Sequence, residues 1–285
     1  MRNCTETRVE TNEILTSGSA YNTFMGRWSR AAAREFLAWL AIPPGRRWLD
    51  VGCGTGSLSA MILESTSPIG VQGIDPSEAS VAYAQFTITD SRARLMVGDA
   101  MALPSEMEGF DVIVSGLVLN QLSSPADGVA EMIRVAKPGG VVAAYVWDFA
   151  EGMQMLRYFW DAAIELDPAA EELDHTRQFA LCHPIRLREL FAGAGLADVR
   201  VRTIEVPAVF RDFDDYWTPF LNGRDLRAPG YVISLNEDRR ARLRERLRAN
   251  LPSGADGSIH LIARAWAVCG SAGRSKTGRD QPTNL

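Results

Sequence analysis

The chain has 285 residues, of which 46% are hydrophobic and 23% are charged, so it can bury a core of ordinary size. Its net charge of −5, from 30 basic and 35 acidic side chains, disfavours nucleic acid and anionic membranes as partners. No uncharged apolar run approaches the ~20 residues of a membrane-spanning helix, the first residues lack the apolar stretch of a secretory signal, and the four cysteines show no C-x-x-C spacing. We therefore expect a cytoplasmic protein with free thiols, no metal site and no membrane insertion.

Residues 1–44 are expected to form a polar N-terminal arm followed by a helix. The run from Ser29 to Leu40 contains helix-forming residues, with apolar side chains at helical spacing. Two prolines and a glycine at 43–45 end this pattern.

Between residues 45 and 149, short apolar strands alternate with helices. Strands are expected at 47–51, 70–74, 94–97, 110–115 and 141–146. Ser77 is expected to cap the helix that follows the second strand. This alternation predicts an α/β fold with a doubly wound parallel sheet and helices on both of its faces. The strands are almost continuously apolar, which is typical of such a buried sheet.

The second half of the chain is less regular. Two aromatic-rich helical insertions, 150–182 and 208–250, are expected to form a lid, although most of their aromatic side chains should simply be core. The segment 183–207 returns to the core, 251–269 supplies the final strand, and 270–285 is a polar tail that we expect to be disordered.

The strongest local motif is the sequence DVGCGTG at residues 50–56, which joins a buried strand to a helix. Its glycines allow a tight turn and the close approach of a ligand. In open parallel sheets, ligands bind beyond the carboxyl ends of the strands. The spacing G-x-G-x-G differs from the dinucleotide fingerprint G-x-G-x-x-G, so the motif predicts a nucleotide-like ligand without identifying it.

Two acidic residues follow the next two strands. Asp75, which precedes Pro76, ends the second strand, where a carboxylate can accept both hydrogen bonds of a ribose diol. This interaction suits NAD and S-adenosylmethionine (SAM) equally. The sequence Gly98-Asp99-Ala100 follows the third strand, where an acid can accept a proton from an adenine amino group while a backbone amide meets the ring.

These motifs, with the strand FDVIVS at 110–115 and the turn KPGG at 137–140, resemble in their order the class I SAM-dependent methyltransferase superfamily, and its bacterial small-molecule members in particular. The resemblance covers about residues 45–147. It implies a Rossmann-like sheet of seven strands with the last strand antiparallel, SAM as the cofactor and S-adenosylhomocysteine as its product. The implied cofactor contacts are Asp50, Gly52, Gly54 and Gly56 for the methionine part, Asp75 with Pro76 for the ribose, Asp99 and Ala100 for adenine, and Leu117 near the sulfonium.

The segment 21–30 resembles the one that closes over the cofactor in many bacterial members of this superfamily. Arg27 or Arg30 would then meet the methionine carboxylate, and Met25 and Trp28 would cover the sulfonium side. An amphipathic helix with solvated arginines explains the same pattern equally well.

Methyl transfer is an in-line displacement for which the cofactor carries the activation, so the protein chiefly positions the acceptor. Trp147, at the end of the fifth strand, is expected to face the acceptor, and Asp148 to bind or deprotonate it. Asn120 is a candidate hydrogen-bonding residue. The candidate bases are His175 and His183, whereas His260 is expected to be structural.

The sequence therefore predicts a SAM-dependent methyltransferase for a small-molecule acceptor: a natural product, a small acid, or a phenol or quinone. The acceptor atom and the oligomeric state stay open. One alternative is a nicotinamide-dependent oxidoreductase, which the loop spacing and the lack of a lysine four residues after Tyr145 disfavour. The other alternative is a non-catalytic SAM-binding protein.

Overall fold

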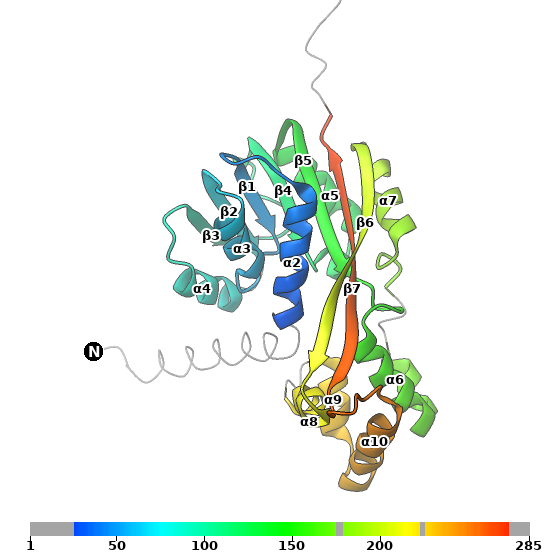
Figure 1. Ribbon diagram of the computed structural model, residues 1–285. Helices are drawn as coiled ribbons and strands as arrows, with labels where there is room; N and C mark the ends of the chain where they lie inside the picture. The colour runs from blue at the N-terminus through cyan, green and yellow to red at the C-terminus, as the bar shows by residue number, and fades with distance from the viewer. Residues whose placement is uncertain (1–25, 175–178, 223–225, 274–285) are drawn as a thin grey trace, which may run out of the picture.

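The computed structural model describes residues 26–174, 179–222 and 226–273. Its centre is a seven-stranded sheet with the strand order β3-β2-β1-β4-β5-β7-β6 (Figure 1). The strands are β1 Arg47–Val51, β2 Gly70–Asp75, β3 Ala93–Val97, β4 Phe110–Gly116, β5 Ala136–Trp147, β6 Ala197–Phe210 and β7 Ile259–Ser271. Strands β1 to β5 pair in parallel, and β7 is antiparallel to both β5 and β6. The expected doubly wound sheet with an antiparallel last strand is confirmed.

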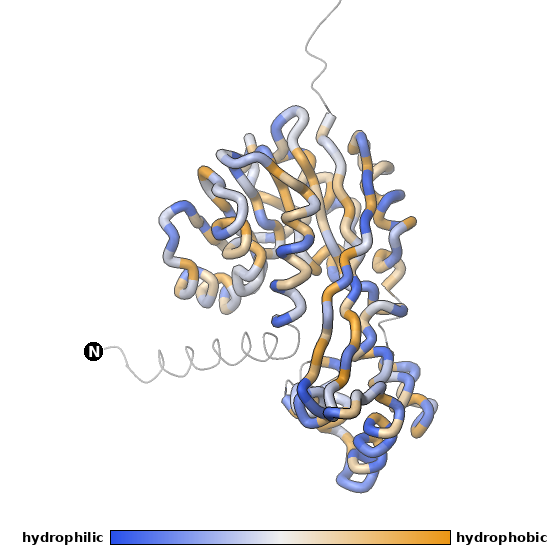
Figure 2. Tube along the Cα trace, viewed as in Figure 1, coloured by the Kyte–Doolittle hydropathy of each residue, from blue (hydrophilic) through white to orange (hydrophobic). Residues whose placement is uncertain are grey.

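Helices cover both faces of the sheet, because successive strand residues point to opposite sides. On β5, Tyr145 and Trp147 belong to the core beneath α2 (Arg27–Leu40) and α3 (Ser57–Ser65). Val146, between them, belongs to the core on the other face, beneath α5 (Pro125–Val135) and α7 (Pro184–Gly193). Helix α4 (Glu78–Thr87) contributes a smaller core beside β3. Figure 2 shows hydrophobic residues concentrated along the central strands.

Local sequence signals set the starts of two helices, of which the first was expected. The Ser77 side chain accepts a hydrogen bond from Ser80 N at 3.2 Å, so Ser77 caps α4 as predicted. Helix α5 begins with Pro125, whose missing N–H costs nothing in the first turn, and Ser124 caps it.

Strands β6 and β7 form a ribbon that extends well past the end of β5. Pairing between β5 and β7 stops at Trp147 and Ala265, whereas β6 and β7 stay paired as far as Phe210 and Ile259. Residues 208–210 therefore belong to a strand and not to the second insertion. Residues 270–271 likewise belong to β7 and not to the tail, because Gly140 and Ala272 hold this end of the strand against β5 with a backbone hydrogen bond of 2.8 Å.

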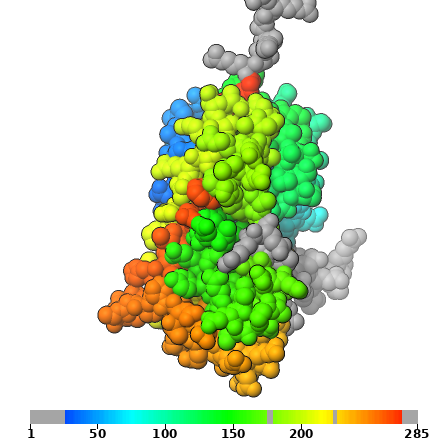
Figure 3. Space-filling model, turned by 90° about the vertical axis from the view of Figure 1, so that its right-hand side faces the viewer, coloured from blue at the N-terminus to red at the C-terminus, as the bar shows by residue number. Residues whose placement is uncertain are grey.

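Both inserted segments meet at the far end of this ribbon (Figure 1). The helices there are α6 Gln154–Leu166, η3 Pro168–Leu173, α8 Phe213–Trp217, η5 Thr218–Leu221, α9 Arg227–Ser234 and α10 Glu237–Asn250. Helices α9 and α10 of the second insertion both pack on α6 of the first, so the two insertions form one distal helical unit. In the side view of Figure 3 this unit is a lobe below β6 and α7. It lies beyond the carboxyl end of β6, which is also the end of the sheet at which the parallel strands have their carboxyl ends.

Most aromatic residues of the insertions are core of the distal helical unit, as expected. Phe159 stacks on Phe220 with ring centroids 4.5 Å apart and meets the edge of Trp160 at 5.1 Å. The Tyr216 hydroxyl donates a hydrogen bond of 2.9 Å to Met155 O. All of these side chains are fully buried or nearly so, which explains their number without any contact to a ligand.

Candidate functional site

The glycine loop between β1 and α3 has a backbone that side chains rarely tolerate. Gly52, Gly54 and Gly56 have φ angles of +78°, +51° and +84°. Gly52 N and Cys53 N both donate hydrogen bonds to Ile74 O, at 2.7 and 3.0 Å. The loop is thereby tied to the end of β2 and held as a fixed turn.

The three glycines serve different purposes. A Cβ atom on Gly52 would lie 2.5 Å from the Val118 side chain, and one on Gly56 would lie 2.6 Å from Ile88. These two glycines are required because the protein packs against them. A Cβ atom on Gly54 would meet only an oxygen of Asp75, at 4.0 Å. Gly54 is therefore the glycine whose backbone is open to a ligand.

Asp75 is fixed beside this opening by two backbone amides. One carboxylate oxygen accepts from Gly54 N and the other from Ser77 N, each at 2.9 Å. The side chain is only half-buried, and each carboxylate oxygen can accept a second hydrogen bond. This geometry suits the two hydroxyl groups of a ribose.

Asp50 lies at the end of β1 and is almost completely buried, at 1% exposure. One oxygen accepts a 2.7 Å hydrogen bond from the Ser59 hydroxyl, whereas the buried Oδ1 atom has no partner. Burial raises the pKa of this carboxyl group to about 7, and the charge of Asp75 adds to the effect. A buried acceptor without a donor is uncommon, so this atom fits a ligand that brings an N–H group to the loop.

The third acidic residue follows β3. The Asp99 side chain is exposed and accepts a 2.9 Å hydrogen bond from Met101 N, next to the buried Ala100. Gly98 N donates to Asp75 O at 3.1 Å, which joins the ends of β2 and β3. Because β1, β2 and β3 are neighbours in the sheet, the three predicted acidic residues lie along one edge. The residues present fit the nucleoside and amino-acid parts of SAM.

At the end of β4, Leu117 has a φ angle of +64° although it is not a glycine. Such a conformation costs free energy in a bulky residue, and it is typically retained at functional sites. Leu117 N donates to Tyr145 O at 2.8 Å, and its own carbonyl accepts from Gln121 Nε2 at 2.9 Å. Asn120, in the turn that follows, is half-buried and makes no side-chain hydrogen bond with the described residues. The strained backbone of Leu117 indicates a functional site, and this strain could not be predicted from the sequence.

The structure separates the roles of the arginines on α2. The guanidinium of Arg27 lies 3.5 Å from Asp215 of the distal helical unit and stacks on Phe210, which also packs against the buried Trp28. Arg30 instead lines a hollow of about 250 Å³ together with Thr55, Gly56 and Ser57 of the loop. Arg30 is thus the arginine that lies beside the glycine loop, and the Trp28 indole is part of the core. Met25 lies outside the described residues.

Two acceptor-side candidates are neighbours in the chain but differ in their contacts. Trp147 is 3% exposed, and its Nε1 atom is buried without a partner. The Asp148 carboxylate accepts from Arg264 Nε at 2.7 Å and from Glu151 N at 3.2 Å. Asp148 is therefore committed to an ion pair that ties the start of the first insertion to β7.

The histidines have structural contacts where they are described. His183 is exposed and caps α7, because its Nδ1 atom accepts a hydrogen bond from Ile185 N at 3.3 Å. His260 lies on β7, exposed, with its Nε2 atom 3.1 Å from the Ser258 hydroxyl. His175 lies outside the described residues.

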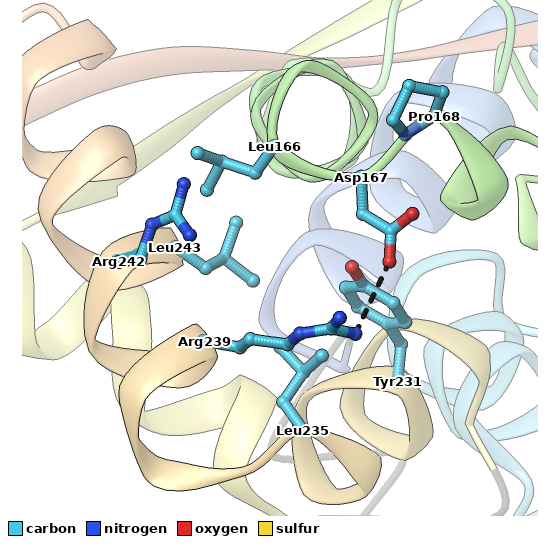
Figure 4. A pocket seen from close by; sticks show the side chains of 8 residues that line it. All are labelled: Leu166, Asp167, Pro168, Tyr231, Leu235, Arg239, Arg242 and Leu243. Atoms are coloured by element: carbon cyan, nitrogen blue, oxygen red, sulfur yellow. Dashed lines mark ion pairs between the residues drawn. The ribbon is translucent and has the colours of Figure 1, made fainter.

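A second hollow, of about 190 Å³, lies within the distal helical unit between α6, α9 and α10 (Figure 4). Leu166, Leu235 and Leu243 line it, and Arg239 approaches Asp167 across it at 3.6 Å. No residue that the sequence singled out contributes to this hollow.

Within the described ranges, no three His, Cys, Asp or Glu side chains are grouped as metal ligands would be, and no helix has the length and apolarity to cross a membrane. Cys53, Cys182 and Cys269 are free and buried. Burial raises the pKa of the Cys182 thiol to about 12, which makes it unreactive at neutral pH.

Residues 49–144 match the family model of a methyltransferase domain. The chain is 31% identical over 179 residues to 2-methyl-6-phytyl-1,4-hydroquinone methyltransferase of Synechocystis sp., a match that covers 62% of this chain and 55% of that protein. It is 30% identical over 176 residues to demethylmenaquinone methyltransferase of Staphylococcus aureus, covering 58% of this chain and 73% of that protein.

Among solved structures, phosphoethanolamine N-methyltransferase 2 of Haemonchus contortus, in complex with phosphomonomethylethanolamine and S-adenosylhomocysteine, has the same fold. The TM-score is 0.55 with 18% identity, over 90% of this chain and 57% of that one. The chain spans about half the length of the first two curated relatives it matches, 55% and 54%, but nearly three quarters of the Staphylococcus aureus enzyme. With these matches and a cofactor edge that fits SAM, the chain belongs to the class I SAM-dependent methyltransferase superfamily.

Proposed function

We propose that this protein transfers a methyl group from SAM to a small aromatic acceptor of the hydroquinone or phenol type. The observation that carries the proposal is the edge formed by the open Gly54, the doubly anchored Asp75 and the unpartnered Oδ1 atom of Asp50. The names of the two curated relatives, both methyltransferases of quinone-type compounds, support the acceptor class.

Each of these residues has a defined task toward the cofactor. Asp50 would accept a hydrogen bond from the methionine amino group, Asp75 would accept hydrogen bonds from the ribose hydroxyls, and Asp99 would accept one from the adenine amino group. Arg30, beside the loop, is placed to attract the methionine carboxylate. SAM supplies a methyl group that is already activated by its sulfonium, so these residues bind and orient rather than activate.

The acceptor side favours a molecule that is nucleophilic by itself. Asp148 is paired with Arg264, and the exposed His183 caps α7, so both of these candidate bases have structural contacts of their own. A hydroquinone or phenol is electron-rich at its oxygen and its ring carbons, and the proton that the methyl group displaces passes to solvent. The buried Leu117 and Trp147 at the ends of β4 and β5 would exclude water and orient such a ring.

Thermal unfolding with SAM, S-adenosylhomocysteine, NAD(H) and NADP(H) tests the cofactor. A ligand at ~100 times its dissociation constant adds about 2.7 kcal/mol, which shifts the midpoint by several degrees in a chain of this size. We expect a shift with the first two ligands alone. Asp75→Asn should abolish the shift, whereas Glu78→Gln, a nearby exposed acid on α4, should retain it.

Transfer of a labelled methyl group then tests the acceptor. We expect product with 2-methyl-1,4-hydroquinone and with 1,4-naphthohydroquinone, and none with an aliphatic amine or thiol of similar size. Transfer to the amine or the thiol, with none to the hydroquinones, would refute the proposed acceptor while leaving the cofactor assignment intact.

A further inference from the structure

We infer that the indole N–H of Trp147 donates a hydrogen bond to an oxygen of the methyl acceptor and so selects oxygen-bearing rings. The inference rests on the proposed function and names the chain's own contact for that acceptor. It begins with a buried donor that has no partner among the described residues, Nε1 of Trp147. Buried polar atoms in folded proteins almost always have a partner, so a lone donor at a ligand-binding edge indicates one that arrives with the ligand.

The position of Trp147 agrees with that role. Tyr145 pairs with Gly116, the last residue of β4, and its ring lies 2.9 Å from where a Gly116 Cβ would be. Side chains alternate along a strand, so Trp147 lies on the same face as Tyr145, one step farther toward the carboxyl end. At that level β4 has already ended and turned away through the strained Leu117. The Trp147 indole therefore extends the sheet edge on which the cofactor residues lie.

Trp48 provides the comparison within the same molecule. It is also buried, at 1% exposure, and its Nε1 atom also has no partner. Its surroundings differ, because Trp48 lies near the amino end of β1, paired with Val71 and Val112 in the closed interior of the sheet. Both indoles pack in the same core, but Trp48 lies at the end of the sheet opposite to the cofactor residues, whereas Trp147 is the last residue of β5, at its carboxyl end.

The chemistry of an indole N–H limits what it can bind. It donates one hydrogen bond and accepts none. A phenol or hydroquinone oxygen accepts such a bond, and so does a carbonyl. A protonated amine offers only donors, and a thiol is a weak acceptor. The contact thus favours oxygen-bearing rings over amine and thiol acceptors.

The test uses the full chain with S-adenosylhomocysteine bound, so that no turnover occurs. The probe is 2-methyl-1,4-hydroquinone, kept under an oxygen-free atmosphere so that it stays reduced. Toluene is the matched probe without hydroxyl groups. We expect the assigned indole N–H resonance of Trp147 to move on addition of the hydroquinone and to stay in place with toluene. This resonance measurement uses the wild-type protein, so it does not depend on how a variant folds.

Binding by the variants supplies the second measurement. Trp147→Phe should weaken hydroquinone binding about three- to tenfold, the range of one neutral hydrogen bond, and should leave toluene binding unchanged. Trp48→Phe should change neither. If wild type binds the hydroquinone while the Trp147 resonance and the Trp147→Phe affinity stay unchanged, the inference is wrong and the proposed function stands. If wild type binds S-adenosylhomocysteine but not the hydroquinone, both the proposed acceptor class and the inference are wrong.

Discussion

The buried carboxyl group of Asp50 should make the stability of the ligand-free protein fall as the pH rises from about 4 to about 7. Its pKa is about 7 in the folded protein, against 3.8 for an ordinary aspartate. Between these values the folded protein keeps a proton that the unfolded chain has lost, so unfolding becomes easier as the pH rises, and the effect levels off above 7. A difference of about 3 pKa units corresponds to at most about 4 kcal/mol.

Asp50→Asn removes this dependence, because an amide stays neutral and its oxygen can still accept the hydrogen bond from Ser59. We expect the variant to match wild type near pH 4, to exceed it by about 1–2 kcal/mol at pH 5 and to exceed it by about 4 kcal/mol at pH 8, measured by urea unfolding without ligand. The same variant should bind SAM at least about tenfold more weakly at pH 8, since it has lost the charge that attracts the amino group.

Asp90→Asn is the matched control. Hydrogen bonds from Arg92 lower the pKa of this exposed acid to about 2, so it is ionised throughout the measured range. Its removal should leave the slope between pH 5 and pH 8 as in wild type. Parallel stability curves for wild type and Asp50→Asn over this range would refute the assignment of the titration to Asp50.

Three further substitutions test the scaffold by urea unfolding. Gly56→Ala should cost about 2–4 kcal/mol, because the added Cβ meets Ile88 and the backbone keeps a φ of +84°; a smaller loss would mean that the loop can shift. Arg264→Met should cost about 2–3 kcal/mol, since it leaves the buried Asp148 carboxylate without its cation; a neutral effect would place that carboxylate in water. Phe159→Ala should cost about 3–5 kcal/mol by opening a cavity in the distal helical unit, and an unchanged midpoint would contradict the fully buried position.

The sequence by itself determined the sheet and the edge on which the site lies. Alternating apolar strands and helices force parallel pairing, and parallel strands bring their carboxyl ends to one edge. Asp50, Asp75 and Asp99 lie at or just past the carboxyl ends of three such strands, so the sequence places them on one edge of the sheet. The periodic strands and the serine cap of α4 depend on neighbours a few residues away, which is why they could be predicted.

Only the tertiary structure decided what each candidate contacts. Asp148 is engaged by Arg264, which is 116 residues away in the chain, and Arg27 is paired with Asp215. The difference between Gly54 and its neighbouring glycines also depends on atoms from other elements. The two insertions form one unit because they pack on each other at the end of the β6–β7 ribbon. Local pattern sets which element a residue occupies, but its partners are set by packing between distant segments, and a one-dimensional pattern does not record that packing.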